Sequence, residues 1–77
     1  MNGEAPIKVY IKVNEQKEIV EINSEIFIKD LSGWIQIDEG FGDKFAHAQG
    51  LYLPAPILGD NGYNFIYENG VISPKGE

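Results

Sequence analysis

Apolar and polar residues alternate strictly near the start of the chain. Between positions 7 and 14, every odd position is apolar and every even one is Lys, Tyr or Asn; the apolar residues are Ile7, Val9, Ile11 and Val13. A period of two is typical of a strand with one buried face. The sequence therefore predicts a half-buried strand over this segment.

The same pattern resumes at 19–22 (Ile-Val-Glu-Ile), after a short polar stretch. A hairpin that continues one apolar face from Val9 and Ile11 onto Val20 and Ile22 needs odd positions opposite even ones, because a slip of one residue turns every side chain over. A two-residue loop at 14–15 and a four-residue loop over 14–17 both satisfy this parity. We predict the hairpin and leave its register open.

A second hairpin is predicted at the C-terminal end. Segments 63–67 and 71–72 are rich in β-forming residues, and they flank Glu68-Asn69-Gly70. Asn-Gly between such segments is a strong hairpin signal, because both residues tolerate the positive φ of a tight turn. Gly59-Asp60-Asn61-Gly62 predicts another turn just before it.

The middle of the chain is less regular. Segment 24–30 is compatible with a short strand or with one helical turn capped by Ser24. Regular secondary structure is predicted to end at Ser32-Gly33. The pattern over 34–38 predicts a further strand, and the glycine-flanked segment 39–42 predicts a turn.

One short helix is predicted after that turn. Asp43 is placed to cap a helix over 44–49, and Gly50 is placed to end it in a left-handed conformation. Segment 51–53 is predicted to be extended. The two prolines of 54–56 place that stretch in a loop or at a sheet edge.

These segments predict a small α+β domain, mostly antiparallel β with two hairpins and one short helix, spanning 1–77. The ends, 1–5 and 73–77, carry few apolar residues and are predicted to fray. The chain contains no Cys, so no disulfide can support this small core. A domain of 77 residues has little stability to spare, which makes a homo-oligomer or a partner protein a reasonable expectation.

The charge balance argues against several partners. The net charge is −6 and all six basic residues are Lys. A chain without Arg, with a twofold acidic excess, is poorly suited to bind nucleic acid. We also expect no membrane span and no signal peptide, because the apolar runs are short and the N-terminus is acidic. We therefore expect a soluble protein made in the cytosol.

Few residues suggest catalysis or metal binding. Asp43 and His47 share one face at helical spacing, and Asp38 and Glu39 are near in sequence. Two ligands at helical spacing fall short of the three or four of a zinc site. We therefore interpret Asp43 as a helix cap and His47 as a residue that is partly exposed or hydrogen-bonded to Asp43. No Ser lies in a nucleophile elbow and there is one His. We expect no enzymatic activity and no cofactor or metal; a metal-assisted hydrolase around Asp38, Asp43 and His47 is the weakest alternative.

Aromatic residues are frequent: four Tyr, four Phe and one Trp. If Ile35 and Ile37 point inward, alternation turns Trp34 to the opposite face, and Tyr63, Phe65 and Tyr67 share one face of the last strand. An exposed aromatic stripe would suit protein association or stacking on sugar rings. Alternatively, the helix and the proline loop cover both faces.

Two linked motifs give a resemblance to a known family. The first is Gly-Trp-Ile-x-Ile-Asp-Glu-Gly over 33–40, and the second is Gly-Asp-Lys-aromatic-x-His-Ala-Gln over 42–49. Together with 22–28, the extended piece 51–53 and the turn and strand over 60–65, they resemble a small family encoded in phage and prophage tail regions of Gram-positive bacteria. The resemblance covers roughly 10–72.

The resemblance implies that the gene lies among those of tail-fibre, baseplate or tail-assembly proteins, and it implies no particular catalytic activity. It predicts a non-catalytic structural or protein-interaction domain whose partner is another tail protein. The alternative is a carbohydrate-binding module that contacts cell-wall glycan of the host through exposed aromatic residues. The candidate interaction residues are Trp34, Asp43, His47, Gln49, Tyr52, Tyr63 and Tyr67.

Overall fold

The structure, a computed structural model, describes residues 5–60 and 62–75. This part of the chain forms antiparallel strands, two short α-helices and one 3-10 turn, and the predicted small α+β, β-rich fold is confirmed. The elements in chain order are β1 (Ile7–Val13), β2 (Ile19–Ser24), η1 (Glu25–Phe27), β3 (Ile35–Gly40), α1 (Asp43–Ala46), α2 (Ala48–Leu51), β4 (Leu58–Gly59), β5 (Gly62–Tyr63), β6 (Phe65–Glu68) and β7 (Val71–Pro74).

The N-terminal hairpin forms, with a register of the predicted parity. Ile11 lies opposite Ile22, so the face that carries Ile11 continues onto β2. Val13 pairs with Ile19, however, so the connection is 14–18, and neither of the two loops compatible with the parity forms. The Asn14 side chain accounts for this loop, because its Oδ1 accepts hydrogen bonds from the backbone N–H of Gln16 and Glu18.

A bulge in this pairing changes which residue of β2 enters the core. Lys12 pairs with Glu21 and Val13 with Ile19, so Val20 is left without a partner on β1. Ile19 is fully buried, whereas Val20, predicted to lie on the apolar face, is only half-buried. β3 completes the sheet on the other side of β1, in the order β2-β1-β3. It extends to Gly40, so Glu39 and Gly40 belong to a strand rather than to the predicted turn.

The predicted helix is split in two. Gly42, with φ of 107°, precedes α1, and Asp43 is the first helical residue and makes no capping hydrogen bond. His47 interrupts the helix with φ of −127° and ψ of 50°, and α2 follows. Gly50 lies inside α2 rather than after it, and Leu51 and Tyr52 are helical rather than extended.

Ser24 explains the interruption. This residue is fully buried, and its Oγ accepts a hydrogen bond from the Ala48 N–H (3.0 Å) and donates one to the Phe45 carbonyl. The Ala48 N–H is thereby held by β2 instead of by the preceding helical turn. Of the two alternatives for 24–30, the helical turn forms, as a 3-10 turn over 25–27, but the Ser24 hydroxyl does not cap it.

The C-terminal hairpin is confirmed. Asn69 and Gly70 have φ of 56° and 78°, and β6 and β7 pair with Glu68 opposite Val71. The strand predicted over 63–67 is divided, because the Asn64 N–H donates to the Ile57 carbonyl and its side chain to that of Pro56. Of the predicted ends, 1–4 and 76–77 lie outside the described residues, whereas 73–74 belong to β7.

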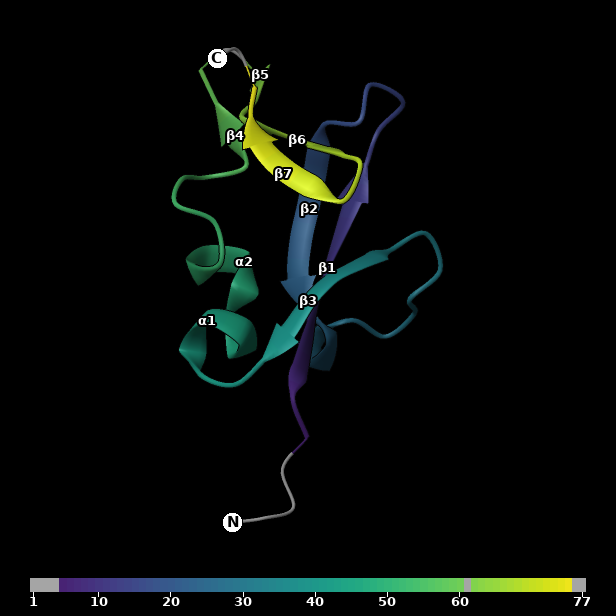
Figure 1. Cartoon of the computed structure of the whole chain (residues 1–77), viewed down its shortest axis with the longest axis vertical. Coiled ribbons are helices and arrows are strands. Elements are labelled where there is room, and N and C mark those ends of the chain that lie inside the picture. Colours follow the sequence, from purple (N-terminus) through teal and green to yellow (C-terminus); the bar gives the residue numbers. More distant parts are fainter. Residues whose placement is uncertain (1–4, 61, 76–77) are drawn as a thin grey trace.

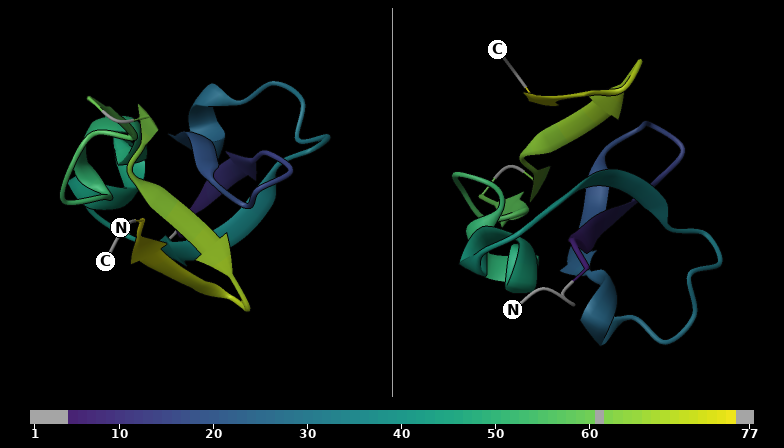
Figure 2. Two further views of the ribbon diagram at one scale, coloured as in Figure 1. Left: turned by 90° about the horizontal axis from the view of Figure 1, so that it is seen from above. Right: turned by 60° about the horizontal axis from the view of Figure 1, so that its bottom comes forward.

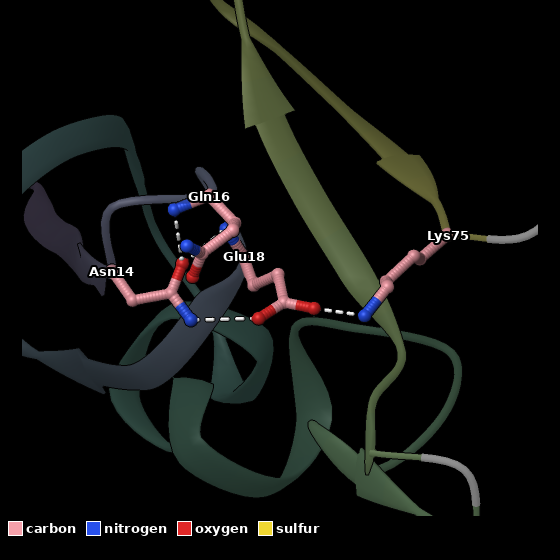
Figure 3. Close-up of polar contacts among 4 residues, drawn as sticks. All are labelled: Asn14, Gln16, Glu18 and Lys75. Carbon is pink, nitrogen blue, oxygen red and sulfur yellow. Dashed lines mark hydrogen bonds and ion pairs between the residues drawn. The ribbon is translucent and has the colours of Figure 1, made fainter.

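The hairpin is fastened to the loop between β1 and β2. The Glu18 carboxylate accepts hydrogen bonds from the Asn14 amide (2.7 Å) and from the Lys75 ammonium (Figure 3). Lys17 and Glu68 form a second, exposed ion pair. The Lys75 N–H also donates to the Asn64 carbonyl, which ties the chain just after β7 to the residue just before β6.

The core lies between the three-stranded sheet, the helices and the hairpin. α1 and α2 lie on one side of the molecule, the loop that follows η1 lies on the other, and β6–β7 cross one end (Figures 1 and 2). The core residues are Val9, Ile11, Ile19, Ile22, Ala48 and Phe65. This core is small, and large apolar side chains such as Phe41 and Val71 stay about 60% exposed.

Candidate functional site

An apolar groove of about 460 Å³ lies between β3, the end of α2 and the β6–β7 hairpin. We call it the hairpin groove. Its lining is Ile37, Tyr52, Leu53, Pro54, Phe65, Tyr67, Gly70, Val71, Ile72 and Pro74. Among the described residues, no carboxylate, ammonium or imidazole group lines the groove. The groove therefore suits an apolar ligand surface rather than an ionic one.

Tyr52 stands at the wall formed by β3 and α2. Its hydroxyl donates a 2.7 Å hydrogen bond to Oδ2 of Asp38. Burial, together with this hydrogen bond and the Asp38 charge, raises the pKa of Tyr52 to about 12. The phenol is therefore neutral at physiological pH and holds the end of α2 against β3.

The Tyr52 ring is also packed by its neighbours on α1. The Lys44 Nζ lies 4.8 Å from the ring centroid, and the Phe45 ring meets it edge-on at a centroid distance of 6.1 Å. These contacts leave Tyr52 half-buried. They fix its orientation, so this wall of the groove is formed before any ligand binds.

The opposite wall is the hairpin itself. Tyr67 and Ile72 lie opposite each other on β6 and β7, and both pack against the core while lining the groove. Val71, just after the Asn-Gly turn, is 59% exposed. It is the large apolar residue that this wall leaves most open to solvent.

The candidate residues from the sequence do not form one site. Tyr52 and Tyr67 line the hairpin groove. Trp34 and Gln49 line a smaller hollow of about 240 Å³ beside β2, and His47 and Gln49 line another of about 330 Å³ with Phe27. These hollows gather three of the seven candidates around β2 and α2. Gln49 also lines a hollow of about 320 Å³ together with Leu53 and Pro54, two residues that line the groove as well.

The remaining two candidates lie outside all of these hollows. Asp43 is exposed at the start of α1, and Tyr63 is half-buried in β5, where it pairs with Leu58. Trp34 is stacked beneath an ammonium, with the Lys12 Nζ 4.9 Å from its ring centroid. The rings of Tyr10, Trp34, Tyr63 and Tyr67 are all buried or half-buried, so they do not make a continuous exposed stripe.

The acidic and imidazole side chains do not converge on a metal. Asp38 is engaged by Tyr52 and by the Glu39 N–H (2.8 Å), and the His47 ring lies 6.3 Å from that of Phe27. Within residues 5–60 and 62–75, no three His, Asp or Glu side chains are grouped closely enough to hold an ion.

Several groove residues were missed from the sequence. Leu53, Val71 and Ile72 looked like ordinary strand residues, because apolar patterning alone cannot say which strand faces stay uncovered. A signal did exist at Val71: it directly follows the Asn-Gly turn, where a hairpin tip projects from the core.

The comparisons with known proteins add no identity. The chain matches no protein-family model, no curated protein and no solved structure. In the described part of the chain, no helix has the length and apolar character needed to cross a bilayer.

Proposed function

We propose that this chain is a non-catalytic protein-interaction domain of a phage or prophage tail, and that it contacts another tail protein through the hairpin groove. The tail context comes from the Gly-Trp-Ile and His-Ala-Gln motifs over 33–40 and 42–49. On this proposal the protein resides in the virion or in the cytoplasm of the host bacterium.

The groove is the observation that supports an interaction role. Its walls are aliphatic, proline and tyrosine side chains, a composition typical of the centre of a protein interface. Val71 on one wall is exposed, and Tyr52 on the other is held in place by Asp38 and Lys44. A preformed apolar wall lowers the entropic cost of binding.

Sugar binding, the other function considered, is less well supported by the groove. Stacking on a sugar needs an open aromatic face with polar groups beside it. The Tyr52 ring is already packed by Lys44 and Phe45, and its hydroxyl is used by Asp38. The other lining residues, apart from Tyr67, offer no side-chain hydrogen-bonding group.

The test is binding to the proteins encoded beside this chain in the tail region, measured with purified components. We expect at least one of them to bind at micromolar concentration, and to lose affinity about tenfold or more when Val71→Lys places a charge in the groove. Leu58→Lys is the matched control, because Leu58 is equally exposed (61%) and lies outside the groove. A signal on a cell-wall glycan array, without binding to any tail protein, would instead support the sugar-binding function.

A further inference from the structure

The outer edge of β7 carries backbone groups that its own hairpin does not use. β6 and β7 are joined by the two residues Asn69 and Gly70, both with positive φ, so Glu68 and Val71 close the turn as a hydrogen-bonded pair. Hydrogen-bonded and non-hydrogen-bonded pairs alternate along an antiparallel ladder. Tyr67 and Ile72 are therefore a non-hydrogen-bonded pair, and the N–H and C=O of Ile72 point away from β6.

Two observed hydrogen bonds agree with this alternation. The Tyr67 N–H, which must also point out of the hairpin, donates to the Lys17 carbonyl at 2.9 Å. The Lys75 N–H donates to the Asn64 carbonyl at 2.7 Å, as expected of a hydrogen-bonded pair one step beyond Phe65 and Pro74. The ladder therefore keeps the same alternation along its whole length.

The two edges of the hairpin differ. The β6 edge is paired with the residues that lead into β2: Ile66 forms a β-bridge with Glu18, and the Tyr67 N–H donates to the Lys17 carbonyl. The β7 edge has no strand beside it within residues 5–60 and 62–75. Pro74, the next outward-facing position, contributes a carbonyl but no N–H, so the open edge is short and centred on Ile72.

This open edge adjoins the hairpin groove. Val71, Ile72 and Pro74 all line the groove, so a strand laid along β7 would place every second side chain in or over it. Such a strand gains main-chain hydrogen bonds at Ile72 and apolar burial against Tyr52 and Leu53 in the same event. This combination is how sheet edges bind extended peptides.

Charge indicates what kind of strand fits. The chain has a net charge of −6, so a second copy would be repelled at long range and a basic segment attracted. The groove itself is lined by uncharged residues in the described part of the chain. The favoured occupant therefore alternates apolar residues, facing the groove, with basic residues facing solvent.

We propose that β7 binds an extended segment of the partner by strand addition at Ile72, and that this segment alternates apolar and basic residues. The inference rests on the proposed function and specifies the partner chemistry of the same groove. It assigns the recognition step to the backbone of Ile72 and to the apolar lining, without a role for Trp34, His47 or Gln49.

The test uses a short synthetic peptide in which valine and lysine alternate, titrated into the full chain and followed by NMR. We expect methyl shifts at Val71 and Ile72, and amide hydrogen exchange at Ile72 slowed about tenfold or more at saturation. In antiparallel addition the valine opposite Ile72, on the groove face, exchanges main-chain hydrogen bonds with it, so N-methylation of the valine amides should weaken binding at least about tenfold. N-methylation of the lysine amides is the matched control and should leave binding unchanged.

Each other outcome overturns strand addition. The proposed pairing would be contradicted by equal binding of the two methylated peptides, by unchanged exchange at Ile72, or by no binding at all. The proposed charge of the segment would be contradicted by equal binding of a valine–glutamate peptide. The binding of tail proteins and its loss in Val71→Lys are measured separately. Failure of the peptide with success of that measurement leaves the groove as the interface and rejects only the strand.

Discussion

The hydroxyl of Tyr52 lies 2.7 Å from Oδ2 of Asp38, and this hydrogen bond joins the end of α2 to β3. Tyr52 lines one wall of the hairpin groove, and Asp38 follows Ile37, another lining residue, on β3. The bond therefore links the stability of the fold to the shape of the proposed binding surface.

Replacing Tyr52 tests this bond through its pH dependence. The folded pKa of about 12 exceeds the ordinary value of 10.0, so the neutral phenol is stabilised by folding. This contribution is complete below pH 10 and is lost as pH rises from 10 through 12. We expect Tyr52→Phe to be less stable than wild type by about 1 kcal/mol at neutral pH, and the difference to shrink above pH 10. Urea unfolding at several pH values measures it, and a pH-independent difference would contradict the assignment.

Ser24 should be a critical polar residue of the core. Ser24→Ala removes the acceptor of the Ala48 N–H and leaves that buried donor unpaired. We expect a loss of about 1–3 kcal/mol in the free energy of unfolding, measured by urea titration. Ser32→Ala, at an exposed position, should change it by less than about 0.5 kcal/mol. Equal effects would mean that Ser24 does not organise the junction between α1 and α2.

Two glycines should respond to alanine in opposite directions. A Cβ at Gly40 would lie 2.7 Å from the Phe45 ring, so Gly40→Ala should destabilise by about 1–3 kcal/mol. A Cβ at Gly50 would meet no atom within 4 Å, and Gly50 lies inside α2. Gly50→Ala should therefore stabilise by about 0.5–1 kcal/mol. Thermal unfolding of the two variants checks both signs, and a stabilising Gly40→Ala would show that Phe45 does not pack there.

Local signals in the sequence predicted the hairpins well. The period of two over 7–13 and the Asn69-Gly70 turn both act through neighbouring residues, and both features formed as expected. The helix over 44–49 failed for the opposite reason. Its interruption at His47 depends on Ser24, which is distant in sequence and binds the Ala48 N–H.

The candidate site was predicted only in part. Tyr52 and Tyr67 line the groove, as aromatic residues of an interaction surface could be expected to do. Val71 and Pro54 were not selected, because their position depends on how the hairpin packs across the end of the sheet. That packing rests on long-range contacts such as Glu18 with Lys75, for which the sequence pattern carries no signal.

The most direct test of the proposed interaction is the affinity of the chain for purified phage tail proteins, compared among wild type, Val71→Lys and Leu58→Lys. Glu68 lies opposite Val71, so the introduced lysine gains a favourable cross-strand neighbour and the hairpin should remain folded. The account predicts micromolar binding by wild type and Leu58→Lys, and a loss of about tenfold or more for Val71→Lys. Binding that is unaffected by Val71→Lys, or no binding to any tail protein, would contradict it.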